Sequence, residues 1–170
     1  MTGRPQESEA APYYFTYINL VKGEDPLVAM EIQLDAALGE FSLFGEEKSL
    51  YRYAPEKWSI REVLNHISDT ERAFAFRALW FARGFASPLP GFDQNISAVG
   101  AKADLVPWAA HIEEFRQVRE STISLFRHLP PEAWMRSGIA SDYPFTVRAL
   151  SFIVAGHVEH HLRLLRERYF

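Results

Sequence analysis

Apolar side chains recur every three or four residues in four separate stretches of this chain, with polar side chains between them. This spacing places the apolar residues of each stretch on one face of an α-helix. The four stretches are 26–44, 60–83, 107–129 and 147–169. No two segments alternate apolar and polar residues in the way that pairing strands do. The pattern therefore predicts an all-α fold, a four-helix bundle in which the apolar faces meet.

The residues that precede these stretches are typical of helix starts. Asp25 is followed by a proline, which fits the first position of a helix. Ser59 and Glu62 form a capping box, in which each side chain accepts a hydrogen bond from the backbone of the other residue. Thr146 can cap the fourth helix. The first three helices are expected to end at Gly45, Gly84 and Pro130.

The connection between the second and third helices is unusually long. Residues 84–104 contain three glycines and two prolines. A connection of this length in a compact domain usually has a purpose. We expect a crossover along the bundle, which would make the second and third helices parallel, or a lid over a site, or both. A second loop is expected over residues 130–145.

The N-terminal residues differ in character from the rest. Residues 1–12 are polar with two prolines and are expected to form a flexible tail, and residues 13–170 a single domain. The aromatic and β-branched run 13–21 could be a short strand or a helical turn. We favour a lead-in segment that covers the core, because no other strand candidate lies nearby to pair with it.

The composition of the chain argues against several classes of function. The 170 residues carry a net charge of −4, which argues against a nucleic-acid-binding surface. The chain has no cysteine, so histidines and carboxylates must hold any metal. No segment approaches the ~20 apolar residues that span a bilayer, and the N-terminus lacks the apolar region of a secretory signal. We therefore expect a cytoplasmic protein that binds neither membranes nor nucleic acid.

Histidines supply the candidate chemistry. His157 and His161 lie one turn apart on the apolar stripe of the fourth helix, where their imidazoles can bind one ion. His66, at the edge of the apolar face of the second helix, is the expected third ligand. Three protein ligands leave a position for water or substrate. The alternative is a set of hydrogen-bonded core histidines, but burying two imidazoles without a partner costs free energy.

The remaining histidines and acidic neighbours have less specific patterns. His160 lies three residues after the first of the pair and is the alternative ligand, but it points away from the leucine stripe. His111 and His128 have no spaced partner and are expected at the surface or at a helix end. Asp69 and Glu159 are expected to face solvent, although either could orient a ligand imidazole.

Glu71, Arg77 and Arg119 are charged residues that call for a separate explanation. An arginine near a core stripe is usually half of a buried ion pair, and near a metal it could bind an anionic substrate group. We favour the structural role. The sequence lacks a Gly-rich phosphate loop, a Gly-x-Ser-x-Gly elbow and the His-Glu-x-x-His motif of zinc proteases.

Several motifs, in order along the chain, resemble those of the DinB-like (YfiT-type) metalloenzymes, a family unrelated to the translesion polymerase of the same name. The motifs are YRYAPEKWSIREVLNH (51–66), DTER (69–72), Arg77-Ala78-Leu79, Ala82-Arg83-Gly84, GHVEHH (156–161) and Glu167-Arg168-Tyr169. The resemblance runs from about Tyr13 onward. It implies a four-helix bundle with a crossover and three histidine ligands, which map to His66, His157 and His161.

The resemblance also implies a divalent metal, most often nickel or zinc, with iron or manganese as further options. Relatives include thiol-dependent transferases and isomerases that use bacillithiol or mycothiol, and a domain in ergothioneine biosynthesis. Members of the family often have an acidic residue directly after the first histidine of the pair, where this chain has Val158. A carboxylate that would orient a ligand is therefore missing at this position.

These observations lead to two expectations of function. The first is a divalent-metal-dependent enzyme, a thiol-dependent S-transferase or a hydrolase that acts on a small molecule. Because the chain has no cysteine, the thiol would come from a low-molecular-weight cosubstrate. The alternative is a non-catalytic metal- or ligand-binding bundle protein in a stress response, a possible homodimer through Tyr13, Trp80 or Phe85. A purely structural bundle is the third reading.

Overall fold

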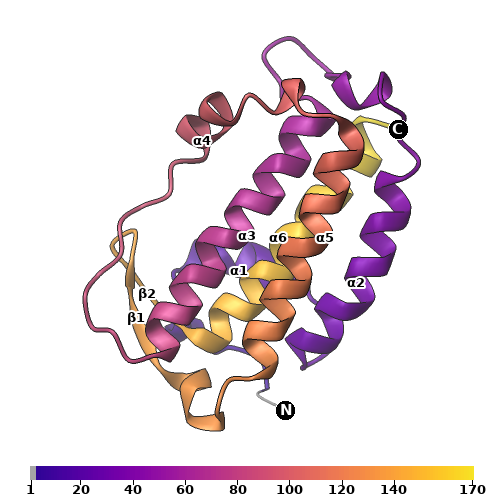
Figure 1. The fold of residues 1–170 in the computed structure, drawn as a ribbon. Helices are drawn as coiled ribbons and strands as arrows, with labels where there is room; N and C mark the ends of the chain where they lie inside the picture. The colour runs from indigo at the N-terminus through magenta and orange to yellow at the C-terminus, as the bar shows by residue number, and fades with distance from the viewer. Residues whose placement is uncertain (1–2) are drawn as a thin grey trace.

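A computed structural model describes residues 3–170 and contains four long helices in that range. These are α2 (Pro26–Phe41), α3 (Ile60–Ala82), α5 (Trp108–Arg127) and α6 (Val147–Arg168). Helix α3 packs on α5 and α6, and α2 packs on the same two helices. In Figure 1, α2 and α6 run in one direction and α3 and α5 in the other. The predicted four-helix bundle is confirmed, including the parallel pair that a crossover creates.

The predicted helix starts are confirmed. The Asp25 side chain accepts hydrogen bonds from the first turn of α2, Ser59 and Glu62 form a capping box at α3, and Thr146 accepts from the first turn of α6. Helix α2, however, ends at Phe41 rather than at about residue 44. Its last turn tightens to hydrogen bonds that span three residues, and Ser42 donates from Oγ to the carbonyl of Gly39 at 2.7 Å.

The crossover between α3 and α5 contains structure that we did not predict. Helix α4 (Gln94–Ala101) is followed by a 3₁₀ turn, η4 (Ala103–Leu105). None of the α4 residues is buried, and eight residues with only Ile96 and Val99 as large apolar side chains are too short a pattern to predict a helix. Figure 1 shows this segment returning along the outside of the bundle to the end from which α3 started.

The segment 130–145, expected to be a loop, contains a 3₁₀ helix, η5 (Pro131–Met135), and part of a β-hairpin. Strands β1 (Ser137–Ala140) and β2 (Tyr143–Thr146) pair antiparallel. The two turn residues, Ser141 and Asp142, have φ of 50° and 66°, as a type I′ turn requires. Sequence reasoning missed the hairpin because this turn type usually has Asn-Gly. A Cβ on Gly138 would lie 2.1 Å from the Phe81 ring, so glycine lets the hairpin pack on α3.

The N-terminal segment corrects another expectation, that of a flexible tail. Arg4 donates hydrogen bonds to the carbonyls of Ile18 and Val21, and the buried Glu9 accepts from Thr146 and Arg148. The chain from Arg4 onward is thus held against the body by partners up to 139 residues away, which no local pattern indicates. Residues 1–2 lie outside the described part of the chain.

Residues 12–18 adopt the helical alternative, not the strand. A 3₁₀ helix, η2 (Pro12–Tyr14), leads into a short helix, α1 (Phe15–Ile18), which packs on α6. A Cβ on Gly156 would lie 2.1 Å from the carbonyl oxygen of Tyr17, so glycine allows this close approach. The aromatic run therefore covers α6 beside the histidine cluster, as the lead-in prediction proposed.

The buried apolar residues form two clusters with polar side chains between them. On α6 the first cluster extends to Ala155 and the second begins at Val158. Buried polar residues lie at the junction: His66, Glu71, Arg119, His157 and His161. Within residues 3–170, no helix has the length and apolar content that crossing a membrane requires.

Candidate metal centre

Three imidazoles converge between α3 and α6. The Nε2 atom of His157 lies 3.1 Å from Nε2 of His66 and 3.1 Å from Nε2 of His161. One ligand atom from each of the three histidines lies within 4.8 Å of the other two. Nitrogens that bind one ion at 2.0–2.1 Å lie about 2.8–3.4 Å apart at tetrahedral or octahedral angles. The spacing in this structure suits a shared ion.

The local sequence explains this arrangement on α6 but only partly on α3. His157 and His161 share one helical face because they are four residues apart. His66 is 91 residues away from His157 in sequence, and the antiparallel packing of α3 on α6 brings it to them. All three are buried, with relative exposures of 6%, 4% and 7%.

Burial keeps the three imidazoles neutral. It lowers the pKa of His66 to about 4, and it holds the pKa values of His157 and His161 well below their ordinary value, with neighbouring imidazoles adding to the effect. Neutral imidazole is the form that binds metals.

The hydrogen-bonding pattern is incomplete without a ligand. A proton on Nε2 of His157 can satisfy only one of its two neighbours. Nδ1 of His161 is buried and has no hydrogen-bond partner. The three imidazoles point lone pairs at one another and have too few protons to pair all of them in hydrogen bonds. A cation would bind these lone pairs, so the residues present fit a divalent metal.

The side chain placed to orient a ligand imidazole is Thr70, not one of the two carboxylates for which sequence reasoning left that role open. Thr70 Oγ1 lies 3.2 Å from Nδ1 of His66 and can fix the orientation of that ring. Asp69 contacts Asn65, Arg72 and Ser97, and Glu159 pairs with arginines on α6, so neither orients a ligand imidazole. Thr70 lies one helical turn after His66, and this spacing was the feature of the sequence that could have predicted its contact with the imidazole.

The other histidines take roles apart from the three ligands. His160 is exposed, and its ring contacts the edge of Tyr17 at 5.4 Å between centroids. His128 is exposed at the end of α5, as predicted. His111 is near the start of α5 but buried, with Nε2 2.9 Å from the carbonyl of Ala103. Val158 is buried in the second apolar cluster, where a carboxylate would lack water.

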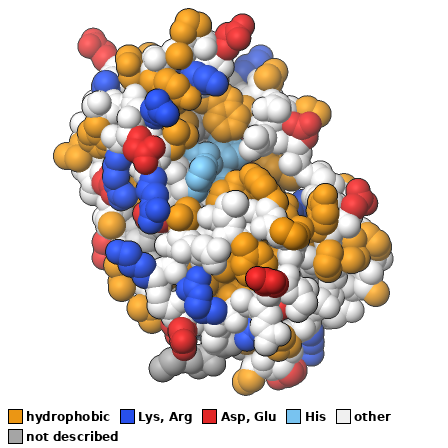
Figure 2. Space-filling view, turned by 180° about the vertical axis from the view of Figure 1, so that it is seen from behind, with side chains coloured by type: hydrophobic (Ala, Val, Ile, Leu, Met, Phe, Trp, Pro, Cys, Tyr) orange, Lys and Arg blue, Asp and Glu red, His pale blue; other side chains and the backbone are white. Residues whose placement is uncertain are grey.

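A cleft of about 130 Å³ opens beside the imidazoles. Its lining includes two of the three histidines, several aromatic rings and one arginine: Tyr13, Tyr14, Tyr17, His66, Thr70, Ala73, Phe74, Arg77, Phe92, Gln94, Ser141 and His157. Phe92 and Gln94 belong to the crossover segment, which therefore also covers part of the site. Figure 2 shows histidine side chains reaching the surface among hydrophobic side chains on this face.

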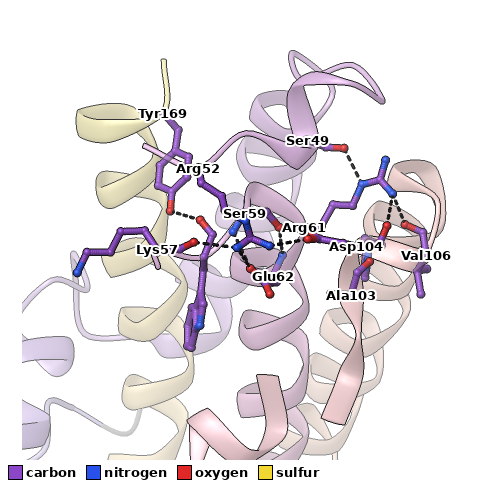
Figure 3. Close-up of polar contacts among 12 residues, drawn as sticks. Ser49, Arg52, Lys57, Ser59, Arg61, Glu62, Ala103, Asp104, Val106 and Tyr169 are labelled. Atoms are coloured by element: carbon purple, nitrogen blue, oxygen red, sulfur yellow. Dashed lines mark hydrogen bonds and ion pairs between the residues drawn. The ribbon is translucent and has the colours of Figure 1, made fainter. Parts of the chain in front are cut away.

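Polar contacts hold the start of α3 to two distant parts of the chain. Ser59 donates from Oγ to the Asp104 carboxylate in the crossover, and Arg61 donates to the Asp104 carbonyl (Figure 3). Tyr169, after the end of α6, donates to the carbonyl of Trp58 at 2.7 Å. These bonds fix the rotation of α3 and hence the direction in which its histidine points.

The buried charges separate into two kinds. Arg119 and Glu71 form an ion pair with Nη2 to Oε2 at 2.8 Å, and both side chains are almost fully buried. Arg119 also donates to Oε1 of Gln33 at 2.8 Å. Arg119 and Glu71 thus have the structural role that we favoured, that of a buried ion pair. Arg77 is different, because it lines the cleft.

Two proteins of known structure have folds similar to that of this chain. The chain is similar to YfiT from Bacillus subtilis, described as a probable metal-dependent hydrolase with an unusual four-helix bundle topology. The TM-score is 0.70 at 15% identity over 96% of this chain and 91% of that one. It is also similar to the mycothiol-dependent maleylpyruvate isomerase, with a TM-score of 0.68 at 12% identity over 81% of this chain and 58% of that one. At these identities the likeness is one of fold.

The sequence comparisons give the family. No curated protein matches the chain. A family model described as the DinB superfamily matches residues 29–165, which include all four long helices apart from a few terminal residues. The chain belongs to the DinB superfamily.

Proposed function

We propose that this protein is a divalent-metal-dependent enzyme in which His66, His157 and His161 hold the ion, and in which a low-molecular-weight thiol or water attacks a small-molecule substrate in the adjoining cleft. The observation that supports this most is the convergence of three buried, neutral imidazoles, with Nε2 of His157 3.1 Å from Nε2 of each of the other two histidines. Nickel and zinc are the metals we favour, with iron and manganese as options, since imidazole suits all but manganese well.

A bound divalent ion supplies Lewis acidity, which lowers the pKa of a thiol or water and so provides a nucleophile at neutral pH. The chain's own residues prepare the cleft for such a reaction. Burial raises the pKa values of Tyr14 and Tyr17, so both hydroxyls stay protonated and can donate to developing negative charge. The aromatic rings of the cleft exclude water and suit a sulfur atom.

The thiol must come from a cosubstrate, because the chain has no cysteine. The structural likeness to an isomerase described as mycothiol-dependent supports a thiol reaction, and the likeness to a protein described as a probable hydrolase supports water. We favour the S-transferase. A homodimer through Tyr13, Trp80 or Phe85 stays a prediction. Trp80 stacks on Phe85 of the same chain, with 4.1 Å between ring centroids.

Metal content of protein purified without a nickel column tests the ligand set. We expect about one divalent ion per chain in the wild type and a loss of at least tenfold in metal affinity in His66→Ala, His157→Ala and His161→Ala. The matched control is His128→Ala, because His128 is exposed at the far end of α5. A His66→Ala protein with full metal content would show that the ligand set is wrong.

Turnover separates the enzyme from the alternative binding protein. The metal-loaded protein is incubated with low-molecular-weight thiols and alkyl or epoxide electrophiles, and the thioether product is quantified. We expect product formation that depends on both thiol and metal. Hydrolysis without a thiol would identify water as the nucleophile. Full metal binding with no turnover under either condition would favour the non-catalytic metal-binding protein.

A further inference from the structure

Arg77 is a buried cation without an ion-pair partner among residues 3–170. Three arginines in the described part of the chain have buried side chains: Arg61, Arg77 and Arg119. Arg61 pairs with Glu46 and Arg119 pairs with Glu71. No aspartate or glutamate within residues 3–170 forms a comparable ion pair with Arg77, although its relative exposure is only 5%.

The contacts of Arg77 hold its guanidinium in place without neutralising it. Nη2 donates to the carbonyl of Pro90 in the crossover at 3.2 Å and to Oγ of Ser141 in the hairpin turn at 2.9 Å. Its other neighbours include the Tyr14 hydroxyl, which is a hydrogen-bond partner, and the Phe74 ring, whose centroid lies 5.4 Å from the guanidinium carbon. Because both acceptors are on Nη2, the donors of Nη1 and Nε are left for Tyr14 and for a ligand.

An uncompensated buried charge is costly, and an anionic ligand would offset that cost. A guanidinium presents its donors in a planar fork that matches a carboxylate. Arg77 lines the same cleft as His66 and His157, with Thr70 and Ala73 between them on the same face of α3. The cleft thus has a metal-ligating end and a cationic end.

We propose that Arg77 binds the carboxylate of an organic-acid ligand whose reacting atom lies at the three imidazoles. The reaction at the imidazoles rests on the proposed function, whereas the binding of the carboxylate by Arg77 does not. His66 and Arg77 are eleven residues apart, about 16 Å along the helix axis. Side chains on an α-helix lean toward its N-terminus, and an arginine that does so leaves on the order of 10 Å between its fork and the imidazoles. The ligand is therefore an elongated acid.

The carboxylate could belong to the electrophilic substrate or to the thiol cosubstrate, and direct binding distinguishes the two. The probes are 4-methylbenzoate with its neutral analogue 4-methylbenzamide, and 3-mercaptopropionate with 3-mercaptopropionamide. Affinities are measured by calorimetry on the metal-loaded and the metal-free protein. We expect at least one acid to bind tenfold or more tightly than its amide, and the preferred pair identifies the source. A wild type that prefers neither acid overturns the proposal.

Substitution of Arg77 assigns the preference to this residue. We expect Arg77→Gln to remove the tenfold preference while the metal content stays that of the wild type. Arg127→Gln is the control, because Arg127 is an exposed arginine on α5 that pairs with Glu31. An Arg77→Gln protein that keeps the preference overturns the proposal. A wild type that binds no divalent metal but prefers the acid through Arg77 overturns only the proposed function.

Circular dichroism shows whether Arg77→Gln folds. If it does not fold, a second substitution still tests the proposal. Arg77→Lys retains the charge but loses the planar fork. We expect it to bind the preferred acid three- to tenfold more weakly than the wild type and still to favour the acid over the amide. Unchanged affinity for the acid in Arg77→Lys would contradict recognition by the fork.

Discussion

At the scale of single residues, burial determines what the histidines can do. An exposed imidazole would be partly protonated near neutral pH, and a proton competes with a metal for the same lone pair. Burial of His66, His157 and His161 lowers all three pKa values, so their lone pairs stay available well below pH 7. The exposed His160 keeps more contact with water and has no part in the cluster.

The lowered pKa values predict how the stability of the metal-free protein depends on pH. The unfolded chain binds protons at its histidines near pH 6.5, whereas folded His66 binds one only near pH 4. Between these values the unfolded state binds more protons, so stability falls as pH falls. By linkage, His66 alone accounts for a loss of about 2 kcal/mol by pH 5.

Urea unfolding of the chelator-treated protein at pH 7, 6, 5 and 4 measures this dependence. His66→Gln, which does not titrate, should show a shallower decline than the wild type over the same range. His128→Gln serves as the control, since the side chain of His128 is exposed. A free energy of unfolding that stays constant between pH 7 and pH 5 would contradict the buried, neutral state of the cluster.

At the scale of elements, the site depends on how closely α1 approaches α6. Tyr17 of α1 lies against His157, with 5.4 Å between ring centroids, and both line the cleft. Gly156 makes this approach possible, because any larger side chain would meet the carbonyl oxygen of Tyr17. Gly156, directly before His157, thus lets Tyr17 lie close enough to form part of the cleft lining.

Gly156→Ala should therefore destabilise the protein although alanine favours helices. Its Cβ would lie 2.1 Å from the Tyr17 carbonyl oxygen, so α1 must move. We expect a loss of about 2–4 kcal/mol in the free energy of unfolding and weaker ligand binding in the cleft.

The matched control for this prediction is Gly39→Ala in α2, where an added Cβ meets no atom within 4 Å. Helix propensity alone then applies, and stability should rise by about 0.5–1 kcal/mol. Thermal unfolding of both variants provides the comparison. If Gly156→Ala gains stability as Gly39→Ala does, α1 does not pack on α6 as closely as described.

At the scale of the whole molecule, a polar layer divides two apolar clusters. The histidine cluster lies at this level, and so does the Arg119–Glu71 pair, which joins α5 to α3. Gln33 connects α2 to the same layer through its hydrogen bond to Arg119 and also donates to the carbonyl of Ala155 on α6. All four long helices therefore meet in one set of buried polar contacts, which specifies their register.

Removal of one member of the buried pair should be costly. Glu71→Gln leaves the fully buried Arg119 without a counter-charge, and we expect a loss of about 3–5 kcal/mol in the free energy of unfolding. The control is Glu31→Gln, because the Glu31–Arg127 pair is exposed and should contribute less than about 1 kcal/mol. Urea unfolding measures both variants. Equal effects would contradict a distinct role for the buried layer.

Local patterns in the sequence were sufficient for the four long helices and for the shared face of two of the three proposed ligands, whereas the place of His66 beside them depends on the packing of α3 on α6. Capping residues such as Ser59 and Thr146 act within one turn of themselves, so their meaning does not depend on the rest of the fold. The shared face of His157 and His161 follows from helical geometry alone. The absence of cysteine, which requires any thiol to come from outside the chain, is also a property of sequence.

Other features depend on residues that are distant in sequence, and only the tertiary structure decided them. The hairpin has an atypical turn, and the anchoring of the N-terminal segment depends partly on Glu9, whose partners lie more than a hundred positions away. Arg77 and Arg119 looked alike as charged residues near apolar stripes, but packing gave Arg119 a carboxylate and left Arg77 without one, facing the cleft. Helical periodicity reports which side chains share a face, whereas the pairing of faces depends on how whole helices pack.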